Sequence, residues 1–200
     1  MKSIVCGAGV VGQSIAESLS KEGLDVTVID ESTELIQKVS ETLDVKTILG
    51  SASLPSILES AGAKDCDILI AVTRSDETNM IVCQIGYSLF NIPTKIARIR
   101  QQDYLKVEWS NLYNKENLPI DVIISPEIEI AKSIQRKLEA PGALDNVNFA
   151  QNRIRMLEIL VNDTCPLVNI PLNELTKKFP KLEANILGVI RNEKFLILKK

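Results

Sequence analysis

Short apolar runs alternate with segments of helical periodicity over the first 140 residues. The apolar runs predict six strands, at 3–6, 26–29, 46–49, 67–72, 94–99 and 121–124. Apolar positions three or four apart predict helices at about 10–21, 34–43, 54–61, 77–90 and 126–138. Strands that alternate with helices form a parallel sheet with helices on both faces, and right-handed crossovers make that sheet doubly wound. The pattern therefore predicts an α/β, Rossmann-like fold.

The pattern after residue 140 is weaker. Pro141-Gly142-Ala143 predicts a turn and a domain boundary. After this turn we predict a strand at 153–161 and a short helix at 172–178. One or two strands then follow over 184–198, around a turn at Asn192-Glu193. Residues 141–200 are too few for a comfortable independent hydrophobic core. The sequence also stops just after an apolar strand, as it would in the middle of a domain. We expect a domain at 1–140, then a linker and the start of a small α+β domain at 141–200, in a fragment or an unusually short protein.

The predicted helix at 77–90 is apolar nearly all round, which indicates burial on more than one side. Two interpretations remain open. The helix packs either on the sheet and a neighbouring helix, or on the sheet and a second subunit.

A glycine-rich loop follows the first strand, with the sequence Gly7-Ala8-Gly9-Val10-Val11-Gly12. The motif G-x-G-x-x-G is weak evidence alone, but here a strand precedes it and a helix follows it. Gly7 permits a tight turn, Gly9 lets a pyrophosphate approach the backbone, and Gly12 lets the helix pack close to the sheet. Phosphates then bind unpaired N–H groups at the helix N-terminus.

Asp30 ends the second strand, 18 residues after Gly12. A carboxylate at this place accepts hydrogen bonds from ribose hydroxyls and repels a 2′-phosphate. Glu31 adds to that repulsion. NAD, or another adenine nucleotide without a 2′-phosphate, is therefore favoured over NADP. The alternative is a glycine turn without a ligand beside a solvated acid.

Other candidate contacts follow the later strands, because ligands of such sheets bind at the carboxyl ends of the strands. Ser51 and Ala52 are small enough to flank an adenine ring, or they form an ordinary turn. Thr73 offers a hydroxyl, or caps a helix. Arg98 suits a phosphate, or is a surface arginine. Glu127 suits a cation near a nucleotide, although helix N-termini favour glutamate anyway.

Composition narrows the functions. The chain has no histidine, which removes the commonest general acid/base and every zinc site that uses histidine. No tyrosine has a lysine four residues on, so the Tyr-x-x-x-Lys pair of short-chain dehydrogenases is absent. The net charge of -3 does not favour nucleic acid as a partner. Four cysteines without a C-x-x-C pair are typical of small core residues.

Localisation is expected to be cytoplasmic. No apolar run of about 18 residues predicts a membrane-spanning helix. The N-terminus runs straight into a strand and has no signal-peptide pattern.

Several of these segments together resemble the RCK/KTN (TrkA-N) domain family. They are the loop at 7–12, Asp30, Gly50-Ser51-Ala52-Ser53, the stretch from Ala71 to Asn79, Ala97-Arg98 and Ser125-Pro126-Glu127. The resemblance covers about residues 1–140, and the remainder is similar to the start of the family's C-terminal domain. Family members usually carry an acid where Ser51 stands, which suggests weaker adenosine recognition there.

The resemblance implies a regulatory subunit of a Trk-type potassium uptake system that binds NAD(H), ATP or ADP. Such subunits form dimers that assemble into rings on the cytoplasmic face of a potassium-translocating membrane subunit, and ligand exchange gates it. The expected nucleotide contacts are Gly7, Ala8, Gly9, Val10, Val11, Gly12, Asp30, Glu31, Ser51, Ala52, Thr73, Arg74, Asn79 and Arg98, with Glu127 as a metal ligand. A small NAD-dependent oxidoreductase and a dimerising scaffold with a vestigial site are the alternatives.

Overall fold

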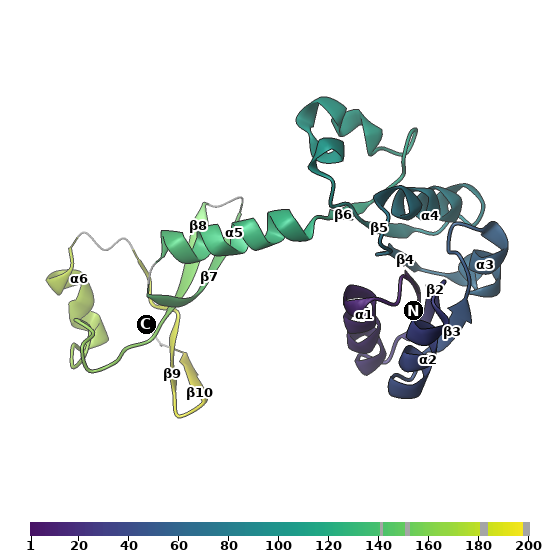
Figure 1. The fold of residues 1–200 in the computed structure, drawn as a ribbon. Helices are drawn as coiled ribbons and strands as arrows, with labels where there is room; N and C mark the ends of the chain where they lie inside the picture. Colours follow the sequence, from purple (N-terminus) through teal and green to yellow (C-terminus); the bar gives the residue numbers. More distant parts are fainter. Residues whose placement is uncertain (141, 151–152, 181–183, 198–200) are drawn as a thin grey trace. The chain divides into compact units, whose positions relative to one another are not determined.

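The computed structural model describes residues 1–140, 142–150, 153–180 and 184–197. The chain divides into two compact units, Met1–Ile134 and Gln135–Lys200. Figure 1 shows the helices and strands of both units.

A six-stranded parallel sheet forms the centre of the first unit. Its strands are β1 (Lys2–Cys6), β2 (Asp25–Asp30), β3 (Lys46–Leu49), β4 (Ile68–Ala71), β5 (Thr94–Arg98) and β6 (Val122–Ile124). They lie in the order β3-β2-β1-β4-β5-β6. Successive strands are therefore added to one side of β1 up to β3 and to its other side from β4 on. The predicted Rossmann-like, doubly wound sheet is therefore confirmed.

Five α-helices among the described residues follow strands of this sheet at the predicted places. They are α1 (Val10–Lys21), α2 (Thr33–Thr42), α3 (Pro55–Ser60), α4 (Asp76–Ser88) and α5 (Pro126–Glu139). Between β5 and β6 the chain forms two 3₁₀ helices, η2 (Gln102–Leu105) and η3 (Val107–Leu112), in place of an α-helix, and a third, η1 (Ala63–Asp65), precedes β4. Ser32 caps α2 as predicted, because its Oγ accepts from the N–H of Leu35 at 3.3 Å.

The sheet has an apolar core on each face. In β1, Ile4 and Cys6 pack with α3 and α4, whereas Val5 packs with α1 and α2. Buried side chains on both faces explain why these strands are continuous apolar runs. On α4, Val82 and Cys83 are buried, whereas Ile81 is 47% exposed. Packing of α4 on a second subunit stays a prediction.

The second unit contains two antiparallel hairpins. One pairs β7 (Ala143–Phe149) with β8 (Ile154–Ile159), and the other pairs β9 (Gly188–Arg191) with β10 (Lys194–Ile197). A 3₁₀ helix, η4 (Leu172–Glu174), and one turn of α6 (Leu175–Lys178) lie between them in sequence. Positive φ angles at Asn192 and Glu193 form the predicted hairpin turn.

Strand β7 corrects the sequence prediction, which placed a turn and linker there. Its residues ALDNVNF contain polar side chains at 145, 146 and 148, so the sequence has no clean apolar alternation. Pairing with β8 stabilises the strand despite that pattern. Pro141 lies outside the described residues. None of the described helices is long and apolar enough to cross a membrane.

A buried lysine ties the start of β5 to the start of β6. The Nζ of Lys95 lies 2.7 Å from the Asp121 carboxylate and donates to the carbonyl of Ile92 at 3.0 Å. Its side chain is only 4% exposed. Burial disfavours the charge of Asp121, but the hydrogen bonds from Lys95 outweigh it and lower the pKa of this carboxyl group.

Replacing Lys95 with methionine should lower the free energy of unfolding by about 2 kcal/mol, because a carboxylate and a carbonyl lose their donor. Urea unfolding of both proteins measures this difference. Lys38→Met, on an exposed position of α2, is the matched control and should change stability by less than about 0.5 kcal/mol.

The pair also predicts a pH dependence. The folded-state pKa of Asp121 lies below its unfolded value of about 3.9, so its contribution is complete above that value and disappears as the pH falls through the lower one. The stability difference between the wild type and Asp121→Asn should therefore shrink below about pH 4. A difference that stays constant down to the acid transition would contradict this account.

Candidate nucleotide-binding site

The glycine loop connects β1 to α1, and its three glycines have different surroundings. Gly7 has φ of 110°, and a Cβ there would lie 2.9 Å from the backbone of Val72. A Cβ on Gly12 would lie 1.8 Å from the carbonyl oxygen of Gly7. A Cβ on Gly9 would meet nothing within 4 Å. The first and third glycines therefore serve packing, while the backbone at Gly9 is open.

Helix α1 begins without a side-chain cap, because its N-cap residue is Gly9. In the part of the chain that the structure describes, no protein group accepts from the N–H of Val10, Val11 or Gly12. Val10 is 87% exposed. Unpaired N–H groups at a helix N-terminus, with the dipole behind them, form an anion-binding arrangement.

Asp30 lies beside this loop and is already hydrogen-bonded to it. Its Oδ2 accepts from the N–H of Ala8 at 2.6 Å, and its Oδ1 accepts from the N–H of Ser32 at 2.8 Å. The carboxylate thus links the end of β2 to the loop, and the N–H of Ala8 is not free for a phosphate. Each carboxylate oxygen has a second lone pair for a ribose hydroxyl. Glu31, next in sequence, is exposed.

Gln13 supports the loop from the other side, and sequence reasoning missed it. Its Nε2 donates to the carbonyl of Ala8 at 2.6 Å. The G-x-G-x-x-G pattern ends one residue earlier, so the motif itself gave no signal. The carbonyl and the N–H of Ala8 are therefore both held, by Gln13 and by Asp30.

The turn after β3 lies next to β2 at the same edge of the sheet. The N–H of Gly50 donates to the carbonyl of Asp30 at 2.9 Å. Ser51 and Ser53 share a hydrogen bond of 3.0 Å between their hydroxyls, and Ala52 is buried. Ser51 is thus close in the fold to Asp30, whereas Ala52 contributes to the core.

Asn79, on α4, joins the ends of β4 and β5. Its Oδ1 accepts from both the N–H and the hydroxyl of Thr73 at 2.8 Å, and its Nδ2 donates to the carbonyl of Arg98 at 2.8 Å. It is 0% exposed. This geometry supports a positioning role for Asn79, and its direct contact with a ligand stays a prediction. Ser75, and not Thr73, caps α4, because its Oγ accepts from the N–H of Thr78.

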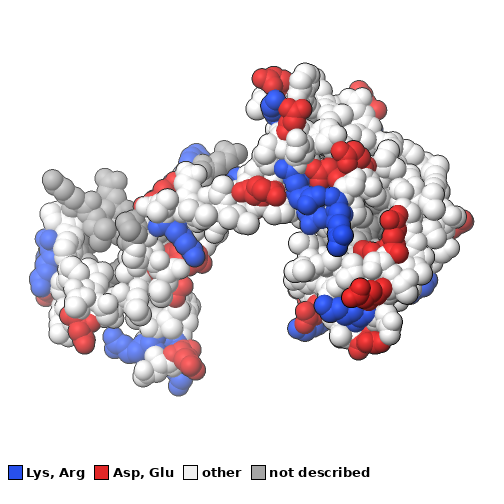
Figure 2. Space-filling view, viewed as in Figure 1, with Lys and Arg blue, Asp and Glu red and all other residues white. Residues whose placement is uncertain are grey.

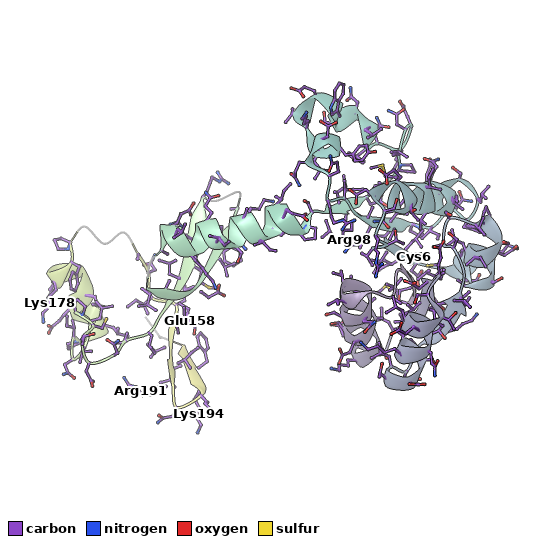
Figure 3. All side chains as sticks on the ribbon, in the orientation of Figure 1. Cys6, Arg98, Glu158, Lys178, Arg191 and Lys194 are labelled. Carbon is purple, nitrogen blue, oxygen red and sulfur yellow. The ribbon has the colours of Figure 1, made fainter. Side chains whose placement is uncertain are left out.

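Arg98 and Arg100 reach over the turn between β4 and α4. The Nη2 of Arg98 donates to the carbonyl of Thr73, and the Nη2 of Arg100 donates to that of Arg74. Burial, and then the neighbouring Arg100, lower the pKa of Arg98. Figure 3 labels Arg98 near β5, and Figure 2 shows a compact basic patch on the first unit with acidic side chains around it. Arg74 itself is exposed.

Glu127 lies in the first turn of α5, and its Oε2 accepts from the Ser125 hydroxyl at 3.4 Å. Among the described residues, no group of three or more His, Cys, Asp or Glu side chains is placed to hold a metal ion. Its role as a cation ligand therefore stays a prediction, and the remaining ligands would have to come from a bound nucleotide or water.

A cavity of about 570 Å³ lies at the opposite, amino edge of the sheet, where its lining includes Lys2, Asp25 and Lys46. It contains none of the predicted site residues. The glycine loop, Asp30, Thr73 and Arg98 instead meet at the carboxyl edge, beside β1, where the strand order reverses. Ligands of open α/β sheets bind at this edge.

A family model described as the TrkA-N domain matches residues 3–126, the range that contains the glycine loop, Asp30, Thr73 and Arg98. The chain belongs to the TrkA-N domain family. The family predicted from the glycine loop, Asp30 and the stretch from Ala71 to Asn79 is therefore confirmed.

Relatives and solved structures agree with this assignment. The chain is 46% identical over 98% of its length to the "Trk system potassium uptake protein TrkA" of Azorhizobium caulinodans, and covers 43% of that protein. It thus spans less than half the length of this relative.

Two solved structures support the fold alone, at low sequence identity. The TrkA-N domain of inner membrane protein ybaL from Escherichia coli has a TM-score of 0.60 at 20% identity, over 68% of this chain and 96% of that one. The GsuK channel bound to NAD has a TM-score of 0.57 at 15% identity, over 75% of this chain and 25% of that one.

The glycine contacts predict losses of stability of different size for two alanine substitutions. Gly12→Ala should lower the free energy of unfolding by about 3 kcal/mol or prevent folding, because the new methyl group overlaps the Gly7 carbonyl. Gly9→Ala should cost less than about 1 kcal/mol, because its methyl group meets open space. Thermal and urea unfolding compare the two variants. Similar losses in both would contradict the assigned packing.

Asn79→Ala should lower the free energy of unfolding by about 3 kcal/mol, because it leaves buried groups of Thr73 and Arg98 without partners. Gln84→Ala on the same helix is the control. Its amide donates only to the Ser88 hydroxyl, so about 1 kcal/mol or less is expected. Equal losses, measured by urea unfolding, would refute the special position of Asn79.

Proposed function

We propose that the chain is the nucleotide-binding part of a regulatory subunit that controls potassium uptake through a Trk-type membrane transporter. One observation carries the nucleotide half of this proposal. Among the described residues, the first-turn N–H groups of α1 have no protein acceptor, and Asp30 is held directly beside them. Together they present donors for a phosphate and acceptors for a sugar.

An adenine nucleotide fits the residues that are present. The open backbone at Gly9 and the N–H groups of Val10 and Val11 would hold its phosphates, and Asp30 would hold a ribose. Ser51 would lie toward the adenosine, and Thr73 and Arg98 toward the far phosphate. Asp30 and Glu31 disfavour a 2′-phosphate, so we propose NAD(H), or ATP or ADP, over NADP.

Regulation is favoured over catalysis. The sequence has no histidine to act as an acid or base. Burial raises the pKa values of the thiols of Cys6, Cys66 and Cys83, that of Cys66 to about 11, so these thiols are protonated and poor nucleophiles. A bound nucleotide would then act as a signal. It regulates only if its affinity differs between two states of the assembly.

The potassium half of the proposal comes from the relatives. The A. caulinodans relative is named a potassium uptake protein, and the GsuK structure is a channel. We propose a homodimer that assembles into a ring, peripheral to the cytoplasmic face of a potassium-translocating membrane subunit. Residues 1–140 would be the family's N-terminal nucleotide-binding domain, and residues 141–200 the start of its C-terminal domain.

Calorimetry tests the nucleotide site. We expect NADH to bind, and NADPH to bind at least about tenfold more weakly because its 2′-phosphate meets Asp30 and Glu31. Asp30→Ala and Gly9→Ala should each weaken NADH binding by about tenfold or more. Glu41→Ala, on exposed α2, is the control and should bind as the wild type does. Equal affinity for NADH and NADPH would contradict the assigned role of Asp30.

Potassium uptake in cells tests the regulatory role, with the substitutions placed in the full-length protein. Variants that lose nucleotide binding should lose the nucleotide response of uptake. Uptake that is indifferent to Asp30→Ala, although binding is lost, would contradict regulation. Turnover of a nicotinamide cofactor with a carbonyl substrate would instead support an oxidoreductase, and absence of all nucleotide binding would support a scaffold.

A further inference from the structure

Asp76 is a buried acid at the first position of α4. It is not part of the glycine loop and is not among the predicted nucleotide contacts. Its side chain is 7% exposed. Its Oδ2 accepts two backbone hydrogen bonds, from the N–H groups of Arg100 and Gln101, each at 2.8 Å. Two donors from consecutive residues converge on one oxygen, so this oxygen fixes the direction in which the chain leaves β5.

The two arginines that this backbone carries depend on that direction. Arg98 is the last residue of β5, and Arg100 follows two positions later. Their Nη2 atoms donate to the carbonyls of Thr73 and Arg74, in the turn that precedes Asp76. The turn and the arginines are thus joined twice, once by the guanidinium groups and once by the Asp76 carboxylate. A displaced backbone at Arg100 would move the Arg100 guanidinium directly, and that of Arg98 through the turn that both groups contact.

Asp76 also lies near the charged groups of both arginines. Burial, and then Arg100, lower the pKa of Arg98 and so disfavour its charged form, whereas Asp76 and Glu127 favour it. The Oδ1 of Asp76 lies 3.7 Å from the Nε of Arg100, and this buried oxygen has no hydrogen-bond partner in the described part of the chain. The Nε of Arg98 is likewise buried, and it has no hydrogen-bond partner among the described residues. The Asp76 carboxylate therefore lies near the positive charges of Arg98 and Arg100, and among the described residues neither guanidinium group donates a hydrogen bond to it.

We propose that Asp76 is a positioning residue for nucleotide binding, whose buried carboxylate holds Arg98 and Arg100 toward the phosphate farther from the α1 N-terminus. The inference rests on the proposed nucleotide site. Asp76 acts through the backbone of Arg100 and Gln101 and does not touch the ligand. It makes affinity depend on the second phosphate, since the N-terminus of α1 serves the first.

Two substitutions separate the position of the acceptor from its charge. Asp76→Asn keeps an oxygen of the same reach for the N–H groups of Arg100 and Gln101, but removes the charge. Asp76→Glu keeps the charge, but its longer side chain displaces the acceptor. Glu77→Gln is the matched control. It removes a charge from the next residue of α4, where the exposed Glu77 accepts from the Tyr104 hydroxyl at 3.3 Å.

The measurement is the ratio of ADP to AMP affinity by calorimetry, with thermal unfolding of each variant in parallel. We expect Asp76→Glu to lower this ratio by about tenfold, because the guanidinium groups of Arg98 and Arg100 would be displaced from the second phosphate. Asp76→Asn and Glu77→Gln should keep at least the wild-type ratio. AMP affinity should stay within about twofold in all three variants.

Different results would overturn the inference in recognisable ways. An unchanged ratio in Asp76→Glu, or equal losses of AMP and ADP affinity, would mean that Asp76 serves stability alone. A ratio that falls in Asp76→Asn as much as in Asp76→Glu would show that charge and not position matters. A wild-type chain that binds none of NADH, ATP, ADP and AMP would refute the proposed function itself, before any variant is compared. A wild-type chain that binds NADH but binds ADP no better than AMP would refute the role of the second phosphate, and with it this inference.

Discussion

The close approach of α1 to the end of β1 is the constraint on which the candidate site depends. Gly12 lies so near the Gly7 carbonyl that no other residue fits, and Gly7 has a backbone conformation that favours glycine. The contact between Gly12 and the Gly7 carbonyl places the first turn of α1 at the carboxyl edge of the sheet. The unpaired N–H groups are therefore in place before any ligand arrives, and binding requires little reorganisation of the loop.

Hydrogen bonds across the strand ends then organise the rest of the edge. Asp30 and Gln13 hold the two sides of Ala8, Asn79 joins β4 to β5, and Asp76 holds the chain beyond β5. These polar groups are partly or fully buried, so losing one partner costs the desolvation of the other. The same bonds that stabilise the fold therefore fix the candidate ligand groups, and substitutions here need parallel measurements of stability and binding.

Much of the site was predictable because its residues follow local rules. The glycine spacing, the acid at the end of β2 and the cap at Ser32 depend on nearby backbone geometry. Gln13 and Asp76 were missed for a different reason. A glutamine in the first turns of a helix and an acid at a helix start are ordinary there, and only their partners from other segments distinguish them. Strand β7 was missed because long-range pairing with β8 outweighs its mixed pattern.

The sequence by itself determined the parallel α/β fold, the glycine loop, the acid beside it and membership of the TrkA-N family. These features depend on periodicity and on residues close together along the chain. Only the tertiary structure decided that Asn79 is fully buried, that Asp30 is bonded to Ala8, and that the N–H groups of Arg100 and Gln101 share one buried acid. Such contacts join residues about 20 or more positions apart, and no local pattern records them.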